Sequence, residues 1–190
     1  MTVYEMNFPQ SLEMLMELIK TKQEGLVVEK AKNLWLATGR TDGTYSETVQ
    51  QEFNIPVFHS EHIGGTCVVF PDDLSFCELS LSYSDFGERA IKAIKDYLTT
   101  FGLVVRLAGN DLMLYSAEEK EEYKVASYGS GWLAKGYMQT VVHVSIGMNE
   151  ELVSRLCTKP CQKKPRGLAQ YGVTAQAVYE VIKPIIEARA

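Results

Sequence analysis

The chain lacks both an excess of positive charge and any long apolar run. Its 190 residues include 19 Lys and Arg against 24 Asp and Glu, which gives a formal net charge of −5 and a pI of about 5.3. Proteins that bind nucleic acid usually present a basic surface, and anionic membranes attract Lys and Arg, so we expect neither partner. No stretch of about 18 apolar residues occurs, and we therefore expect no transmembrane helix.

The N-terminal segment also lacks the features of an export signal. It reads MTVYEMNFPQSLEMLMELIK, with acidic residues where a signal peptide carries positive charge and with no uninterrupted apolar core. We therefore expect a cytoplasmic protein. In that reducing compartment the cysteines should remain thiols, available for chemistry or for core packing. The four cysteines are Cys67, Cys77, Cys157 and Cys161.

No internal repeat, low-complexity segment or linker rich in Pro, Gly and Ser divides the chain. With 46% hydrophobic and 23% charged residues, its composition is that of an ordinary globular protein. A chain of this length fits one domain that buries about 70% of its unfolded surface. We expect a single domain over residues 1–190.

The pattern of apolar residues predicts short strands interspersed with helices. Helical periodicity or capping residues predict helices at 9–22, 46–53, 86–101, 149–155 and 174–186, with Asn149 and Thr174 as caps of the last two. Short β-branched and aromatic runs predict strands at 34–37, 57–58, 66–70, 74–81, 104–106, 112–114, 124–128 and 137–146. Strands outnumber helices and follow one another in hairpin-like runs, which favours an α+β domain with a largely antiparallel sheet.

Lys124 is the first candidate for chemistry. It follows the acidic pair Glu121 and Glu122 and begins a strand that is otherwise small or apolar. A lysine at such a position can lay its methylene stem over the sheet and direct its ammonium group into a pocket. The alternative is an edge-strand lysine that only discourages aggregation. The residue alone leaves both interpretations open.

Cys161 is the second candidate, because it lies in a polar loop directly after Pro160. Basic neighbours lower the pKa of a thiol and raise its thiolate fraction, as a nucleophile requires. Unpaired cysteines are mostly core residues, so a cysteine in this setting is unusual. The alternative is an incidental thiol on a basic surface loop. The basic neighbours are Lys159, Lys163, Lys164 and Arg166.

Gly64 and Gly65 precede the predicted strand that begins at Thr66. Paired glycines let backbone N–H groups approach a ligand closely and receive an anion or an acyl carbonyl. Taken alone the pair is a weak signal, because a hairpin or a β-bulge can also contain two glycines.

A zinc site is a further possibility in the same region. His59, His62, Cys67 and Cys77 carry the side chains that bind zinc. Their spacing fits no compact two-plus-two pattern, and the glycine turn accounts for the segment without a metal. We expect no metal, with Cys77 in the core and Cys67 beside the pocket.

Together these segments resemble the lipoyl(octanoyl) transferases and lipoate–protein ligases, a superfamily that shares its scaffold with biotin–protein ligases. The strand that ends at Gly39-Arg40 looks like the one that opens their substrate pocket, and the turn before Thr66 looks like their glycine-rich ligand loop. Further matches are Lys124-Val125-Ala126-Ser127-Tyr128-Gly129 with the octanoyltransferase signature Lys-Ile-Ala-x-Ile-Gly, the strand around His143 with a histidine-bearing strand, and Pro160-Cys161 with the Pro-Cys of the catalytic loop.

The resemblance implies a mixed, mostly antiparallel sheet flanked by helices, and transfer of an octanoyl or lipoyl group without a cofactor. The donor would be an acyl carrier protein thioester and the acceptor a lysine of a lipoyl-domain protein. Cys161 would be the nucleophile, and Lys124 would exchange protons beside it. The residues expected to bind the acyl substrate are Gly64, Gly65, Thr66, Arg40, Phe70, Ala126, Gly129 and His143.

The sequence also departs from the family pattern. Phe70 stands where the family has a histidine, Gln162 replaces the glycine after the cysteine, and the paired arginines of the ligases are missing. Without those arginines an ATP-dependent mechanism is disfavoured, because phosphates need such partners. Two alternatives remain. One is an ATP-dependent lipoate or biotin ligase in which Cys161 is incidental, and the other is a non-catalytic member that binds a ligand or a partner.

Overall fold

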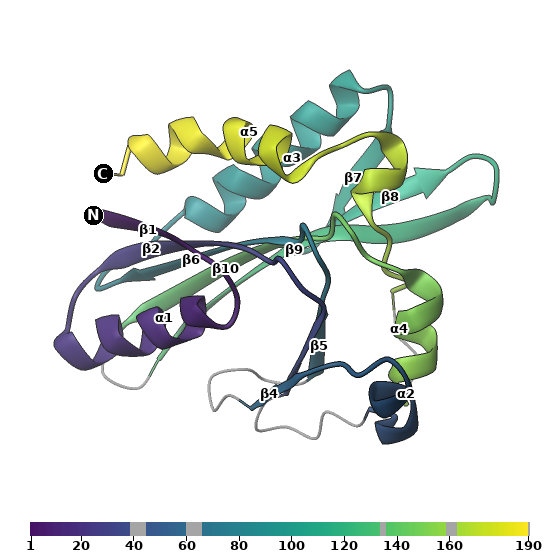
Figure 1. Ribbon diagram of the computed structural model, residues 1–190. Coiled ribbons are helices and arrows are strands. Elements are labelled where there is room, and N and C mark those ends of the chain that lie inside the picture. Colours follow the sequence, from purple (N-terminus) through teal and green to yellow (C-terminus); the bar gives the residue numbers. More distant parts are fainter. Residues whose placement is uncertain (39–44, 60–65, 134–135, 159–162, 190) are drawn as a thin grey trace.

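A computed structural model gives the structure of the chain and describes residues 1–38, 45–59, 66–133, 136–158 and 163–189 (Figure 1). The strands form two sheets of unequal size, and helices cover both faces of the larger one. This is the α+β architecture that the sequence predicts. Within the described ranges, no helix is long and apolar enough to cross a membrane.

The larger sheet contains seven strands in the order β1-β2-β6-β10-β9-β8-β7. β1 and β2 are parallel, and the other neighbouring pairs are antiparallel, so the sheet is mixed and mostly antiparallel as predicted. The bounds are β1 (Thr2–Met6), β2 (Gly25–Lys30), β6 (Leu74–Ser80), β7 (Val104–Ala108), β8 (Asp111–Ser116), β9 (Glu121–Trp132) and β10 (Met138–Val144).

The smaller sheet lies below the larger one in Figure 1, on the side that also carries α1. Its central strand β3 (Trp35–Thr38) is parallel to β4 (Val57–His59) and antiparallel to β5 (Thr66–Val69). This sheet and helix α4 share a small apolar core. Its members are Leu36, Ile55, Val68, Phe70, Leu152, Val153 and Leu156.

The helices are α1 (Gln10–Thr21), α2 (Glu47–Glu52), α3 (Phe86–Thr100), α4 (Glu150–Leu156), α5 (Ala175–Glu187) and the short 3-10 helix η1 (Leu168–Tyr171). All five predicted helical segments are confirmed. The predicted caps are confirmed as well: the Asn149 side chain accepts a hydrogen bond from the N–H of Leu152, and the Thr174 side chain accepts one from the N–H of Ala177.

The main core lies between the larger sheet and helices α3 and α5. Successive side chains of a strand point to opposite faces, so Leu26 and Val28 of β2 face this core while Val27 faces away from it. On the opposite face, α1 packs Leu15 and Leu18 against Val27. The face under α1 is the one that carries the site described below.

β1 and β2 are the two strands that the sequence analysis did not predict. β2 is buried without interruption from Gly25 to Glu29. A strand covered on both faces lacks the alternation of apolar and polar residues by which strands are recognised. β1 lies at the edge of the sheet and pairs with β2 alone, so its assignment depends on a strand that was itself not predicted.

Candidate functional site

An apolar cavity of about 280 Å³ lies between α1, the larger sheet and the smaller sheet. Because residues two apart on a strand share a face, each strand contributes alternate side chains to its walls. The principal lining side chains are Leu12, Leu15 and Ile19 of α1, Val27 of β2, Val141 of β10 and Val69 of β5. A space of this kind suits an apolar ligand.

Polar side chains in the cavity wall are bound to one another. Ser11 donates a hydrogen bond to the carboxyl group of Glu29, and Nε2 of Gln139 donates one to Sγ of Cys77 at 3.3 Å. Burial raises the pKa of the Glu29 carboxyl, which favours its neutral form. These hydrogen bonds pair polar groups of the wall with one another, and most of the other lining side chains are apolar, so the cavity suits an apolar occupant.

A second hollow, here called the basin, adjoins the cavity. Its volume is about 560 Å³, and Cys67 and His143 line both hollows. Charged side chains line the basin, namely those of Lys124, Asp111 and Lys163. An apolar cavity thus meets a charged basin at Cys67 and His143.

Lys124 reaches the basin from β9, next to a β-bulge. The register between β8 and β9 shifts between Leu112, which pairs with Ala126, and Met113, which pairs with Lys124. A bulge bends its strand and changes the direction of the side chains beside it. The direction of the Lys124 side chain therefore depends on an irregular part of the ladder.

Asp111 binds the ammonium group of Lys124. The distance from Lys124 Nζ to Asp111 Oδ1 is 2.9 Å, and Lys163 binds the other carboxylate oxygen. Partial burial opposes ionisation of Asp111, but hydrogen bonds from Lys163 and Lys124 outweigh it and lower the pKa of this carboxyl. The carboxylate is thus held between two cations.

Backbone hydrogen bonds join Lys124 to the segment at residues 163–166. The N–H of Lys124 donates to the carbonyl of Lys164 at 2.7 Å, and the N–H of Arg166 donates to the carbonyl of Lys124 at 2.9 Å. This segment is fixed beside Lys124 by main-chain bonds as well as by the shared carboxylate. Cys161, two positions before it in the sequence, lies outside the described residues.

His143 stands where the cavity meets the basin. Its Nδ1 lies 3.1 Å from Oγ of Ser75, and its Nε2 lies 3.9 Å from Oδ2 of Asp73. Burial opposes charge on both members of the second pair, so it lowers the pKa of the imidazole and raises the pKa of the Asp73 carboxyl. Asp73 also accepts hydrogen bonds from the N–H groups of Ile146 and Gly147, which ties the start of β6 to the chain just after β10.

Cys67 and Cys77 face the cavity, but neither thiol suits nucleophilic attack. Cys67 has surface open to the cavity and the basin, but the protein atoms packed around its thiol still remove much of its hydration. Desolvation by these surrounding atoms raises the pKa of the Cys67 thiol to about 12, and the nearby acidic side chains of Asp73 and Glu29 add to the rise. Burial also raises the pKa of the Cys77 thiol to about 12. The reactive species is the thiolate, so both groups are poor nucleophiles near neutral pH.

Two of the site residues expected from the sequence, Lys124 and His143, lie together at the basin. Ala126 is buried in the main core, and Gly129 lies on the exposed part of β9. The ring of Phe70 packs in the smaller core and does not border the cavity or the basin among the described residues.

The other expected site residues lie wholly or partly outside the residues that the structure describes. Arg40, Gly64, Gly65 and Cys161 are outside the described residues, and Thr66 is described only as the first residue of β5. His62, part of the zinc alternative, is also outside them. Over the part of the chain that the structure does describe, no group of three or more His, Cys, Asp or Glu side chains could hold a metal ion.

Three acidic residues shape the site although the sequence analysis gave them no role: Glu29, Asp73 and Asp111. Glu29 had a recognisable signal, because it follows Leu26-Val27-Val28 and an acidic residue in such a run is unusual. The contacts of Asp73 and Asp111 could not be predicted from their sequence neighbours, because their partners lie more than ten residues away: the backbone beyond β10 for Asp73, and the Lys163 side chain for Asp111.

No protein-family model matches the chain, and no curated protein matches it in sequence. Solved structures do match. The bipartite lipoate–protein ligase of Thermoplasma acidophilum, reported with its E2 lipoyl domain, is 12% identical with a TM-score of 0.69, and the match covers 96% of this chain and 80% of that one. LipL1 of P. falciparum in complex with lipoate is 13% identical with a TM-score of 0.70, covering 96% and 60%.

A lipoate–protein ligase A bound with ATP is also similar, at 11% identity and a TM-score of 0.67, and the match covers 95% of this chain and 81% of the ligase. At such low identity the likeness concerns the arrangement of the elements. The chain has the fold of the lipoate–protein ligases.

Proposed function

We propose that this protein transfers an octanoyl or lipoyl group from a carrier-protein thioester to a lysine of a lipoyl domain. The observation that carries the proposal is the apolar cavity that meets the Lys124 basin at Cys67 and His143. A medium-chain acyl group would occupy the cavity, and its carbonyl carbon would lie in the basin. The ligase fold supports this assignment, and the T. acidophilum structure, which is reported with a lipoyl domain, supports the choice of acceptor.

Cys161 is the proposed nucleophile. Both Cys157 and Lys163, which flank the segment that contains it, line the basin. An extended chain covers roughly 7 Å over two residues, so the backbone of Cys161 can lie no farther than that from the backbone of Lys163, which lines the basin. We expect its sulfur to lie within about 5 Å of Lys124 Nζ, close enough for the ammonium to favour the thiolate.

The proposed reaction has two acyl transfers. The Cys161 thiolate attacks the donor thioester, the carbon–sulfur bond to the carrier breaks, and the departing carrier thiolate takes a proton from Lys124. The lysine of the lipoyl domain then attacks the new thioester, Lys124 accepts the proton that this amine loses, and Cys161 leaves as a thiolate. Lys124 thus acts first as general acid and then as general base. The oxyanion needs backbone N–H donors, and the cysteine loop is our candidate for them.

The paired state of the basin carboxylate supports a thioester donor over activation by ATP. Magnesium, which accompanies ATP, is bound through carboxylates. Among the described residues that line the basin, Asp111 is the only carboxylate, and Lys124 and Lys163 already bind it. A thioester needs no metal and no phosphate site.

Acylation of an isolated lipoyl domain tests the proposal. Octanoyl carrier protein should support acylation without ATP, whereas free octanoate with ATP and magnesium should not. Lys124→Ala should slow the reaction by about 100-fold or more, because general acid–base catalysis contributes about 10² to 10⁴. Acylation that depends on ATP would identify a ligase. Octanoate binding without any transfer would identify a binding protein.

A further inference from the structure

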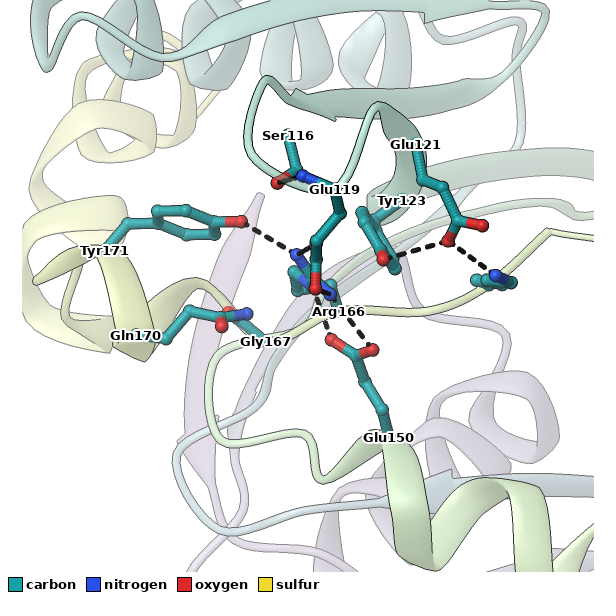
Figure 2. Close-up of polar contacts among 10 residues, drawn as sticks. Ser116, Glu119, Glu121, Tyr123, Glu150, Arg166, Gly167, Gln170 and Tyr171 are labelled. Carbon is teal, nitrogen blue, oxygen red and sulfur yellow. Dashed lines mark hydrogen bonds and ion pairs between the residues drawn. The ribbon is translucent and has the colours of Figure 1, made fainter.

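Arg166 is a buried cation that joins separate parts of the fold (Figure 2). Its side chain is 8% exposed, and its guanidinium binds the carboxylates of Glu119 and Glu150, with Nη1 also 3.4 Å from the Tyr171 hydroxyl. Glu119 lies in the turn between β8 and β9, Glu150 begins α4 and Tyr171 ends η1. Arginine is rarely buried unless its donors are bound in this way.

Each carboxylate meets the guanidinium through both of its oxygens. Nη2 lies 3.0 Å from Oε1 of Glu119 and 3.3 Å from Oε2 of Glu150, while Nη1 and Nε bind the second oxygens. Two bidentate pairs fix the plane of the guanidinium as well as its position. The hydrogen bonds from Arg166 also lower the pKa of Glu119 to about 2, so this pair stays charged at neutral pH.

The fixed guanidinium lies against the residue next to Lys124. Its Cζ is 3.2 Å from the centroid of the Tyr123 ring, and Tyr123 directly precedes Lys124 on β9. Neighbouring side chains of a strand point to opposite faces. Holding the Tyr123 ring on the Arg166 side therefore directs the Lys124 side chain to the basin side.

The bulge makes this restraint necessary. Val125 is the extra residue between the pairs formed by Lys124 and Ala126, so the ladder is interrupted beside Lys124. A shift of one residue would exchange the faces to which Tyr123 and Lys124 point. The N–H of Arg166 also donates to the carbonyl of Lys124 at 2.9 Å, which holds the same position from the backbone.

We propose that Arg166 is a positioning residue that keeps β9 in register at the bulge and thereby aims Lys124 into the basin. That the direction of the Lys124 side chain matters for catalysis rests on the proposed function. That Arg166 sets this direction does not. The neighbouring ion pairs of Lys163 and Lys164 cannot replace Arg166, because these side chains are 40% and 61% exposed and exposed pairs contribute little.

Two substitutions in the full chain test the proposal. Arg166→Lys keeps the charge but loses both bidentate pairs and the flat contact with Tyr123, and Arg166→Gln also removes the charge. The first readout is the rate at which acetic anhydride modifies Lys124, measured by peptide mapping relative to the exposed Lys92. We expect this rate to rise by roughly threefold or more in both variants as Lys124 leaves Asp111, since its side chain, which is 35% exposed in the paired state, becomes more accessible to the reagent.

The second readout is acyl transfer. We expect kcat to fall by roughly 10- to 100-fold, because a displacement of about 1 Å in an active site can cost 10²-fold. The KM for the acyl donor should change less, since its cavity is intact. Arg106→Gln is the matched control: Arg106 forms a bidentate pair with Glu122 on the same sheet but is 58% exposed, and both readouts should stay within about twofold of wild type.

Thermal unfolding shows which variants are folded. If the Arg166 variants are not, Glu150→Gln decides the question, because it weakens one bidentate pair and leaves the other; the same changes should appear at smaller size. Wild-type Lys124 labelling and kcat in folded Arg166→Gln, or in Glu150→Gln if that variant is needed, would overturn the proposal. Full transfer by Lys124→Ala would instead reject the proposed function. The labelling rate of Lys124 in the Arg166 variants would still test the positioning role of Arg166.

Discussion

The role of Lys124 depends on residues that are far from it along the chain. Asp111 binds its ammonium group. The backbone N–H of Lys124 donates to the carbonyl of Lys164, and the backbone carbonyl of Lys124 accepts from the N–H of Arg166. Sequence reasoning could find Lys124, because the signature around it is local. It could not find Asp111 as its partner, because that contact requires the particular register of β8 and β9 at the bulge.

His143 is a second residue whose properties come from the fold. Burial lowers the pKa of its imidazole, whereas in the unfolded chain the pKa is about 6.5. As the pH falls from about 7 through that value, the unfolded state therefore binds a proton that the folded state resists. The free energy of unfolding should therefore fall as the pH falls, by at most about 1.4 kcal/mol per pH unit for one proton, until the pH reaches the pKa of His143 in the folded protein.

Urea unfolding of wild type and His143→Gln between pH 5 and pH 8 measures this effect. The variant should lose less stability than wild type as the pH falls, and the difference between the two curves reports the histidine together with Asp73, whose carboxyl interacts with it. Parallel curves would mean that the imidazole is no harder to protonate in the folded protein than in the unfolded chain.

At the scale of elements, local signals predicted the helices and most strands. The caps Asn149 and Thr174 marked the starts of α4 and α5, since a capping side chain acts on the next turn of its own helix. β2 was not predicted because both of its faces are covered, one by α1 and the other by α3 and α5. Burial on two faces is a property of the assembled layers, and it removes the alternation that a sequence can display.

A substitution at Gly147 tests how closely the chain after β10 packs against the turn before β6. A Cβ at this position would lie 2.0 Å from the carbonyl oxygen of Pro71, and backbone cannot move away as cheaply as a side chain. Gly147→Ala should lower the free energy of unfolding by about 3 kcal/mol, at the upper end for overpacking. It should also disturb the Asp73 bonds beside His143.

Gly131→Ala in β9 is the control, because a Cβ there would meet no atom within 4 Å. Its free energy of unfolding in urea should stay within about 0.5 kcal/mol of wild type. Equal stability of the two variants would contradict the close approach of Gly147 to Pro71.

At the scale of the whole molecule, the site is the space left between the two sheets. The order of the motifs along the chain was enough to predict the ligase-like fold, which the structure confirms. The resemblance implies an apolar tunnel for the acyl chain, but the residues of its walls could not be predicted, because they come from α1, β2, β5 and β10, which meet only after the sheets have packed. Nor could the sequence place Phe70, whose ring fills the smaller core.

The length of the cavity should set the length of the acyl group. Val141→Phe would place a ring among the lining side chains and leave less room for a chain. We expect octanoyl transfer to fall by about tenfold or more relative to hexanoyl transfer, because a few methylene groups in an apolar pocket discriminate on this scale. Competition between the two acyl carrier proteins measures the ratio.

Val104→Phe is the matched control for that experiment, since Val104 is an exposed residue of β7 and does not line the cavity. It should keep the wild-type ratio. A ratio in Val141→Phe equal to that of the control would mean that the acyl chain binds elsewhere.

In the proposed reaction Cys161 carries the acyl group between donor and acceptor. The most direct test is the intact mass of the protein after incubation with octanoyl carrier protein in the absence of ATP, followed by peptide mapping. We expect one octanoyl group on Cys161, which is lost when a lipoyl domain is added, and no adduct on Cys161→Ser. An unmodified protein, or an octanoyl group that Cys161→Ser still acquires, would contradict it.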